Sequence, residues 1–399
     1  MANFVQIYKS TDANAPVLTG QVSKLVDLLD AVLVNGYTTA SVASITRSGS
    51  TVTVTLSAAN STLVTGDYVK LSGAVETDYN GVWQITVTSS TTFTFNIGVL
   101  TPTSPATGTI LYRKAPLNWT KPYTGTNAAV FRSQNTGSPR HYLQVIDNGA
   151  TAGGATESQV MAFETMSAYN TGTGPFPTVA QRANGLCWFK SNTADSTARA
   201  WTIIGDDKGF YLQINSNGTA ATTNLFGFGW FPSYKAGDAY NTFIAGSPTF
   251  NSANPQYTGL NYLSAFTATN SAPSATGGIY LARSFSQTGG SISVPILPGF
   301  GIQSIPGNSY SGVSSGVAYP DLVASGVIVA PVFISEPITG TPIRGRLPGF
   351  YSPFHHVAFS NYDDLSGISG LAGLTLTVLT LSSNYTEGQA SIDRIGPWA

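Results

Sequence analysis

Residues 51–56 read TVTVTL, and this stretch decides the fold class. Its apolar residues occupy every second position and alternate with threonine, which places all the apolar side chains on one face of a β-strand. Residues 92–96, TFTFN, repeat the pattern, and the turn-forming pairs Gly66-Asp67 and Asn80-Gly81 precede further short apolar runs. Five or six short strands predict a small β-barrel or sandwich over residues 38–112.

The rest of the chain has the same β character, apart from one N-terminal segment. With 399 residues, of which 42% are apolar, the chain is long enough for two or three cores. The predicted fold class is mainly β, a multidomain β-sandwich or barrel-like architecture with one N-terminal helix. The predicted domains are an N-terminal arm with a docking helix (residues 1–37), the small inserted β module (38–112) and a large β domain (113–399).

The N-terminal segment Gln21–Asn35 has the 3.6-residue apolar period of a helix, and Gly36 follows where a helix end is expected. Leu25 and Leu29 lie on the apolar stripe, whereas Leu28 lies off it and indicates a second contact. Two interpretations stay open. Either the helix packs on its own domain, or it docks on another protein.

The large domain contains an internal echo between residues 118–149 and 187–218. Matching residues recur 69 positions apart: Trp119 and Trp188, Lys121 and Lys190, Tyr142 and Tyr211, Gly149 and Gly218. The echo predicts a duplicated β unit and a core of paired sheets. Near the end of the sequence, residues 371–381 (LAGLTLTVLTL) predict a central or paired strand, because an uncharged free edge promotes aggregation.

Charge is scarce throughout the sequence. Only 9% of residues are charged and the net charge is −1, whereas an ordinary globular domain has roughly 25% charged residues. Such a surface suits a protein whose working state is an assembly, because few charges must lose their hydration on association. The dispersed lysines and arginines make no basic stripe, so no nucleic-acid partner is expected.

The sequence carries no long apolar run and no visible signal peptide. The apolar stretch at residues 323–334 is too short and interrupted to span a bilayer, so no membrane insertion is expected. The start, MANFVQIYKS, lacks a basic region followed by an apolar run, which predicts synthesis and assembly in a cytoplasm. Cys187 is the only cysteine, so no intrachain disulfide can form, and a buried, inert thiol is expected.

Residues that could carry chemistry are few. His355-His356 with Asp363-Asp364 is the one cluster that resembles a metal site, but neighbours in a strand point to opposite faces. The pair Asp206-Asp207 lies in the sequence Gly205-Asp-Asp-Lys-Gly209, which is typical of a hairpin turn. We therefore predict no catalytic residue, no metal site and no cofactor.

A set of short segments, spread over most of the chain, carries a resemblance to known proteins. These segments are Val34–Tyr37, Gly66–Val69, Tyr79–Trp83, Pro116–Trp119, Thr126-Asn127, Phe131-Arg132, Thr173–Pro177, Tyr234–Asn241, Arg344–Gly349 and Ile392–Trp398. They resemble a group of bacteriophage and prophage virion proteins, and residues 41–112 resemble a small β module inserted in many phage structural proteins. The resemblance implies a virion component, from the head exterior or from the tail and baseplate, and it supplies no catalytic residue.

The resulting hypothesis is a non-enzymatic structural virion protein that assembles with copies of itself and with other virion proteins. The alternatives are a tail protein that binds a receptor or a host surface glycan and, less favoured, a polysaccharide depolymerase, which needs two close carboxylates in a cleft. The predicted interface residues are apolar, aromatic or arginine side chains: Leu25, Leu28, Leu29, Trp230, Tyr234, Tyr240, Arg344 and Arg346.

Overall fold

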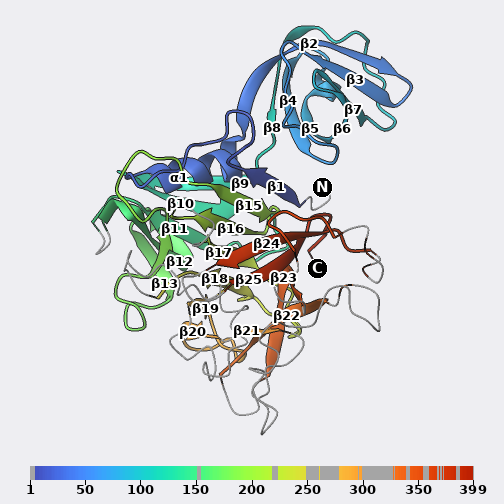
Figure 1. Cartoon of the computed structure of the whole chain (residues 1–399). Coiled ribbons are helices and arrows are strands. Elements are labelled where there is room, and N and C mark those ends of the chain that lie inside the picture. The colour runs from blue at the N-terminus through green and yellow to red at the C-terminus, as the bar shows by residue number, and fades with distance from the viewer. Residues whose placement is uncertain are drawn as a thin grey trace.

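The computed structural model shows a mainly β chain, which confirms the predicted fold class (Figure 1). Within the part of the chain that the structure describes, the strands form three sheets of seven, six and twelve strands. The residues that the structure describes are 5–150, 154–217, 223–248, 260, 278–294, 296–298, 327, 329–337, 342–353, 359–365, 368, 371, 373–382 and 387–398.

The seven-stranded sheet is formed by residues 37–114 and projects from the rest of the molecule, which we call the body (Figure 1). We call this sheet with its connections the module. Its strands follow the spatial order β5-β4-β8-β2-β3-β7-β6. They are β2 (Tyr37–Ser48), β3 (Thr51–Leu56), β4 (Tyr68–Ala74), β5 (Gly81–Gln84), β6 (Thr86–Ser89), β7 (Thr92–Asn96) and β8 (Gly108–Lys114), with a short 3-10 helix, η2 (Thr77–Tyr79).

The module closes into a barrel through Ile85. Strands β5 and β6 lie at opposite ends of the spatial order, yet only Ile85 separates them in the chain. The amide of Ile85 donates to the carbonyl of Asp67 (2.9 Å), and its carbonyl accepts from the amide of Gly66 (2.8 Å). One continuous segment thus borders both ends of the sheet, and the closure removes the long free edges that an open sheet would present.

The alternation of the sequence accounts for the module core. Val52, Val54 and Leu56 point inward and are at most 4% exposed, while the threonines between them stay near the surface. Phe93 and Phe95 of β7 point into the same core. The period-two spacing of the sequence thus matches the buried and exposed faces of these two strands.

The body contains the other two sheets. The six-stranded sheet has the order β13-β12-β11-β10-β9, with β14 paired to β12. Its strands are β9 (Trp119–Gly125), β10 (Ala128–Ser133), β11 (Tyr142–Ile146), β12 (Glu157–Ala168), β13 (Thr171–Phe176) and β14 (Leu186–Phe189), and the 3-10 helix η3 (Gly154–Thr156) precedes β12.

The twelve-stranded sheet starts at the N-terminal strand β1 and runs β1-β15-β16-β17-β24-β25-β23-β22-β21, while β18, β19 and β20 continue from β17. Its members are β1 (Gln6–Lys9), β15 (Trp201–Gly205), β16 (Gly209–Asn215), β17 (Thr223–Trp230), β18 (Thr242–Ala245), β19 (Ile279–Leu281), β20 (Ile292–Ser293), β21 (Ile296–Pro298), β22 (Val329–Ser335), β23 (Ile343–Pro353), β24 (Leu376–Ser382) and β25 (Glu387–Asp393).

The middle strands of this large sheet are buried on both faces. In β15, Ile203 packs into the core shared with the six-stranded sheet, while its neighbour Ile204 packs into a second core on the opposite face. In β16, Leu212 likewise packs into the shared core and Tyr211 into the second core. Continuous apolar runs, rather than alternation, are what a strand covered on both faces requires.

The helix is shorter than predicted. The α-helix α1 spans Lys24–Leu29, and a π-helix, η1 (Asp30–Asn35), continues it. The amide of Gly36 donates to the carbonyl of Ala31 (2.7 Å), and Gly36 takes a positive φ of 73°. The carboxylate of Asp147 accepts a hydrogen bond from the amide of Leu25 (2.9 Å) and so holds the start of α1 against the six-stranded sheet.

The two halves of the internal echo adopt different pairings. Residues 118–149 form β9, β10 and β11, which lie side by side in one sheet. In residues 187–218, β14 joins the six-stranded sheet, whereas β15 and β16 belong to the twelve-stranded sheet. The C-terminal apolar stretch forms β24, which lies between β17 and β25, as expected for a central strand.

Candidate functional site

The predicted interface leucines lie inside the body. Leu25, Leu28 and Leu29 are each 0% exposed and pack with residues such as Trp119 and Phe131 in the core between the sheets. The structure therefore selects the interpretation in which the helix packs on its own domain. The expected interface role of these three leucines is corrected, because their apolar surface is already buried within the chain.

Arg344 is also internal. Its guanidinium makes two hydrogen bonds to the carboxylate of Asp238 (2.7 and 3.0 Å) and pairs with the carboxylate of Glu336. It also donates to the carbonyl of Arg283 (3.2 Å). All three charged side chains of this cluster are at most 1% exposed. The predicted surface role of Arg344 is corrected, since the guanidinium is 0% exposed and four of its five N–H donors are already used within the chain.

Arg346, two residues along the same strand, has a different setting. It is half-buried and lines a pocket of about 300 Å³. Tyr351, Asp393 and Trp398 line the same pocket. Burial raises the pKa of Tyr351, and nearby Arg346 partly opposes this increase. Arg346 is thus the predicted arginine that remains at the surface.

The three predicted aromatic residues differ in exposure. Tyr234 is 59% exposed, whereas Trp230 is half-buried with the ammonium of Lys208 4.2 Å from its ring centre. Tyr240 stacks against His141, with ring centres 6.1 Å apart, and the guanidinium of Arg283 lies 4.1 Å from the ring centre on Tyr240. Only Tyr234 therefore offers a largely free aromatic ring.

Tyr234 belongs to an exposed apolar surface of the body. Phe285 and Ile343 are 37% and 42% exposed, respectively. The ring of Phe285 lies near Lys235 (4.4 Å) and near the buried Arg344 (5.8 Å), and the Tyr234 amide donates to the carbonyl of Arg344 (2.8 Å). We call Tyr234, Phe285 and Ile343 the Tyr234 face. All three residues adjoin Arg344 of the ion cluster: Tyr234 through a backbone hydrogen bond, Phe285 through its ring and Ile343 as its neighbour in the chain.

His141 is buried between strands of the body. Its Nδ1 lies 2.9 Å from the hydroxyl of Thr242. Burial lowers the pKa of His141 to about 4, so the imidazole is neutral near pH 7. His355 and His356 lie outside the described residues.

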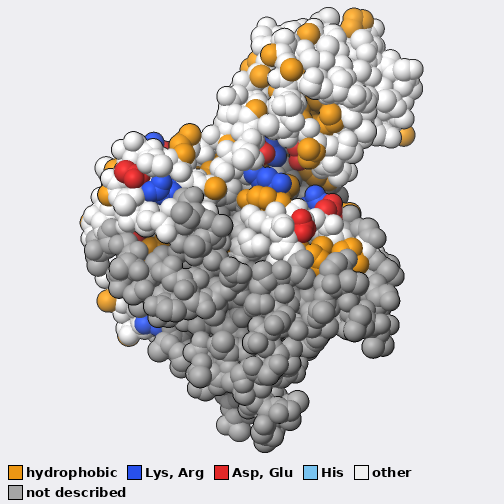
Figure 2. All heavy atoms as spheres, in the orientation of Figure 1, with side chains coloured by type: hydrophobic (Ala, Val, Ile, Leu, Met, Phe, Trp, Pro, Cys, Tyr) orange, Lys and Arg blue, Asp and Glu red, His pale blue; other side chains and the backbone are white. Residues whose placement is uncertain are grey.

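A charged cluster joins the module to the body. The ammonium of Lys114 lies 2.8 Å from the carboxylate of Asp12 and 3.7 Å from that of Asp67. The hydroxyl of Tyr37 donates to Asp12 (2.6 Å), and burial raises the pKa of Asp67. Figure 2 shows blue and red side chains at the base of the module, whereas its outer part is white and orange on the face drawn.

Part of the charge of the chain is used in buried ion pairs, which involve three basic and five acidic side chains. Ten ion pairs join described residues, in a chain with 18 basic and 19 acidic residues. The pairs of Lys114, Lys190 and Arg344 have side chains that are at most 10% exposed. The outer surface is therefore even poorer in free charge than the composition indicates.

The two adjacent aspartate pairs lie in turns. Asp206 accepts hydrogen bonds from the amides of Lys208 (2.8 Å) and Gly209 (2.9 Å). These bonds lie in the predicted hairpin turn, which connects β15 and β16. Asp363 accepts from the amide of Ser360 (2.7 Å), and Asp364 pairs with Arg394. Within the described residues, no group of three His, Cys, Asp or Glu side chains could hold a metal ion.

Asp206 is a buried carboxylate with a raised pKa. Its side chain is 1% exposed, one oxygen has no hydrogen-bond partner, and burial raises its pKa to about 6. Its turn fastens the two body sheets together. The indole of Trp119 donates to the carbonyl of Asp206 (3.1 Å), and the amide of Asn135 donates to the carboxylate of Asp207 (2.9 Å).

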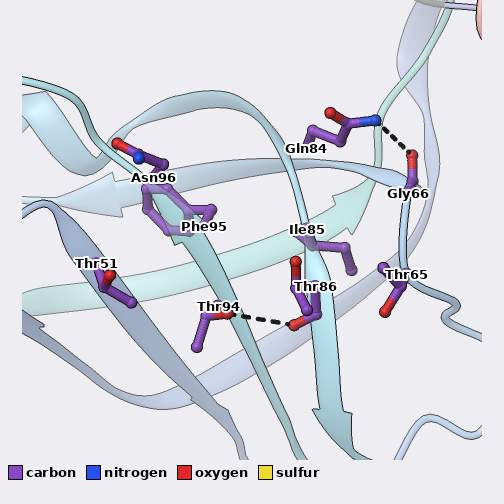
Figure 3. Close-up of a pocket in the computed structure, with 9 residues that line it drawn as sticks. All are labelled: Thr51, Thr65, Gly66, Gln84, Ile85, Thr86, Thr94, Phe95 and Asn96. Atoms are coloured by element: carbon purple, nitrogen blue, oxygen red, sulfur yellow. Dashed lines mark hydrogen bonds between the residues drawn. The ribbon is translucent and has the colours of Figure 1, made fainter.

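Sequence reasoning missed a groove on the module, where the seam between β5 and β7 opens beyond Ile85 (Figure 3). Thr86 pairs with Thr94, but β5 then turns away to pair with β4, which leaves a hollow of about 470 Å³. We call it the seam groove. Its lining residues are Thr51, Thr65, Gly66, Gln84, Ile85, Thr86, Thr94, Phe95 and Asn96. The sequence signal was present only as a high local density of threonine and amide residues.

No protein-family model matches the chain, and no curated protein matches it either. Among the described residues, no helix has the length and apolar character needed to cross a membrane. Evidence on function therefore comes from the residues of the chain itself.

Proposed function

We propose that the chain is a non-enzymatic structural component of a bacteriophage particle that assembles with copies of itself and with neighbouring virion proteins. Its place is on the head exterior or in the tail and baseplate. The virion assignment follows from the resemblance of segments such as Pro116–Trp119 and Arg344–Gly349 to phage structural proteins. The surface chemistry of the chain supports the assembly part independently.

The observation that carries the assembly proposal is that charged side chains form ion pairs inside the chain. Lys114, Lys190 and Arg344 are paired inside the chain, in a sequence with only 9% charged residues. The remaining surface consists largely of hydroxyl, amide and apolar groups. Such a surface loses little hydration free energy on burial against another protein, and weak mutual repulsion does not keep copies apart.

The Tyr234 face is the proposed contact surface. Aromatic residues are enriched at the centres of protein interfaces, because a large rigid ring buries much apolar area at low entropic cost. Tyr234 is held from below by its backbone bond to the Arg344 strand. The proposed occupant is a second copy of this chain.

The oligomeric state of the full chain tests the proposal. Light scattering during size-exclusion chromatography is expected to show an oligomer, and Tyr234→Asp is expected to shift it toward monomer by placing a charge in the contact. Val179→Asp, at an apolar position that is 62% exposed and lies outside the Tyr234 face, is the control. An oligomer that Tyr234→Asp leaves intact would exclude this face.

Location in particles tests the virion part separately. Antibody labelling or image reconstruction of intact phage particles is expected to place the protein at a fixed, repeated position. A purified chain that remains a monomer and does not attach to particles contradicts the proposed function as a whole.

A further inference from the structure

The seam groove is lined by neutral polar groups. Its polar side chains are the amides of Gln84 and Asn96 and the hydroxyls of four threonines. Amides and hydroxyls can both donate and accept hydrogen bonds. They therefore match a ligand whose own groups do both, which is the property of sugar hydroxyls.

These polar groups are accessible. Gln84 and Asn96 are exposed, and Gln84 makes only a long hydrogen bond to the carbonyl of Gly66 (3.4 Å; Figure 3). A ligand hydroxyl could replace that bond at little cost. In Figure 3, Gln84 and Asn96 come from strands on different sides of the seam, so they could contact a ligand from two directions.

The groove also has an apolar floor. Ile85 and Phe95 line it and are 2% and 4% exposed. The ring of Phe95 stacks on that of Trp83, with centres 4.5 Å apart and planes at 22°. This stacking fixes the orientation of Phe95. A rigid apolar floor beneath polar walls suits a ligand with C–H faces and hydroxyl edges.

The absence of charge in the groove limits the ligand class. None of the nine lining residues is acidic or basic. An ion that entered would lose hydration without gaining a counter-charge, whereas a neutral polyol would exchange water hydrogen bonds for protein ones. The lining therefore disfavours phosphate, carboxylate and ammonium groups.

We propose that the seam groove binds a neutral saccharide. Its volume of about 470 Å³ lies at the lower end of the range for small-molecule pockets, roughly 300–1,000 Å³, which suits one or two sugar units. This binding is independent of the proposed assembly role, because the module holds the groove within its own barrel. Either proposal can fail without the other.

The test uses the full chain with defined probes. Glucose, galactose, N-acetylglucosamine and maltose are titrated by calorimetry and by ligand-observed NMR, alongside glucuronate and inorganic phosphate. At least one neutral sugar is expected to bind with a Kd of about 1 mM, since a small open groove yields modest affinity. Glucuronate and phosphate are expected to bind at least tenfold more weakly.

Two variants with a matched control locate the binding. Gln84→Leu and Thr86→Val remove polar groups from the groove, and each is expected to weaken sugar binding about three- to tenfold. Thr88→Val is the control, because Thr88 is exposed on the same strand but does not line the groove. Circular dichroism and melting curves check that all three variants keep the fold.

Three results would overturn the proposal. The first is that no neutral sugar binds at concentrations up to tens of millimolar. The second is that binding is equal in wild type, Gln84→Leu and Thr86→Val while the control behaves like wild type. The third is a preference for the anionic probes over the neutral sugars.

Discussion

The module and the body stabilise β-sheets in different ways. The module closes seven short strands into a barrel and buries one face of each strand. An alternation of apolar and polar residues is therefore enough to form its core. The body buries strands such as β16 on both faces and places ion pairs inside. The comparison shows that a chain with few charged residues can bury several of them. Here the buried ion pairs connect segments that are distant in sequence.

The largest expected effect tests the internal ion cluster of the body. Arg344→Met leaves Asp238 and Glu336 buried without their counter-charge, which is expected to lower the free energy of unfolding by about 3–5 kcal/mol. Chemical denaturation measures the change. Arg346→Met is the matched control, and its half-buried position predicts a loss of at most about 1 kcal/mol. Equal losses would show that the cluster does not hold the body together.

A second pair of variants asks whether the two regions have separate cores. Leu71→Ala in the module and Leu212→Ala in the body each remove a buried side chain, at a cost of about 2–4 kcal/mol. Because the cores are distinct, each substitution is expected to shift a different transition in differential scanning calorimetry. A single transition that both variants shift equally would mean that the regions unfold as one unit.

A third prediction concerns pH and Asp206. Its folded-state pKa of about 6 exceeds the usual 3.8, so its contribution to stability is present below pH 3.8 and is lost as the pH rises through 6. In Asp206→Asn this loss disappears. The stability of the variant relative to wild type is therefore expected to increase by about 2–3 kcal/mol between pH 4 and pH 8.

Denaturation curves at several pH values measure this difference. Asp207→Asn is a useful comparison, because Asp207 lies next to Asp206 in the same turn. A relative stability of Asp206→Asn that stays constant across this pH range would mean that Asp206 titrates normally.

The smallest expected effect is at the module surface. Val99 is 95% exposed, so Val99→Thr is expected to change the free energy of unfolding by less than about 0.5 kcal/mol. The same measurement as for Leu71→Ala applies. A loss comparable to that of Leu71→Ala would indicate that the module core extends to this position.

The sequence predicted the module better than the body, for a physical reason. Strand β3 alternates because one face meets the core, and this pattern is local. In the body, strand partners are chosen over long distances: β14 pairs with β12 and β17 with β24, and no local pattern encodes these choices. The echo of residues 118–149 in residues 187–218 therefore did not reveal that the second segment divides between two sheets.

The site residues were only partly predictable for the same reason. Arg344 and Arg346 look alike in sequence, but the partner Asp238 of Arg344 lies 106 residues away. Likewise, Leu28 lay off the apolar stripe and indicated a second contact, and the structure buries it in the core of the body. The seam groove depends on where the barrel closes, which residue spacing alone does not specify.

The pairing of β1 has a consequence for synthesis on the ribosome. Gln6 pairs with Gly205 and Lys9 with Thr202, so β1 must wait for residues almost 200 positions later. At roughly 5–20 residues per second, that wait lasts about 10–40 seconds. The module, complete by residue 114, has time to fold during this interval. We therefore expect a nascent chain with a folded barrel whose β1 segment still lacks its partner strand and can be bound by a chaperone.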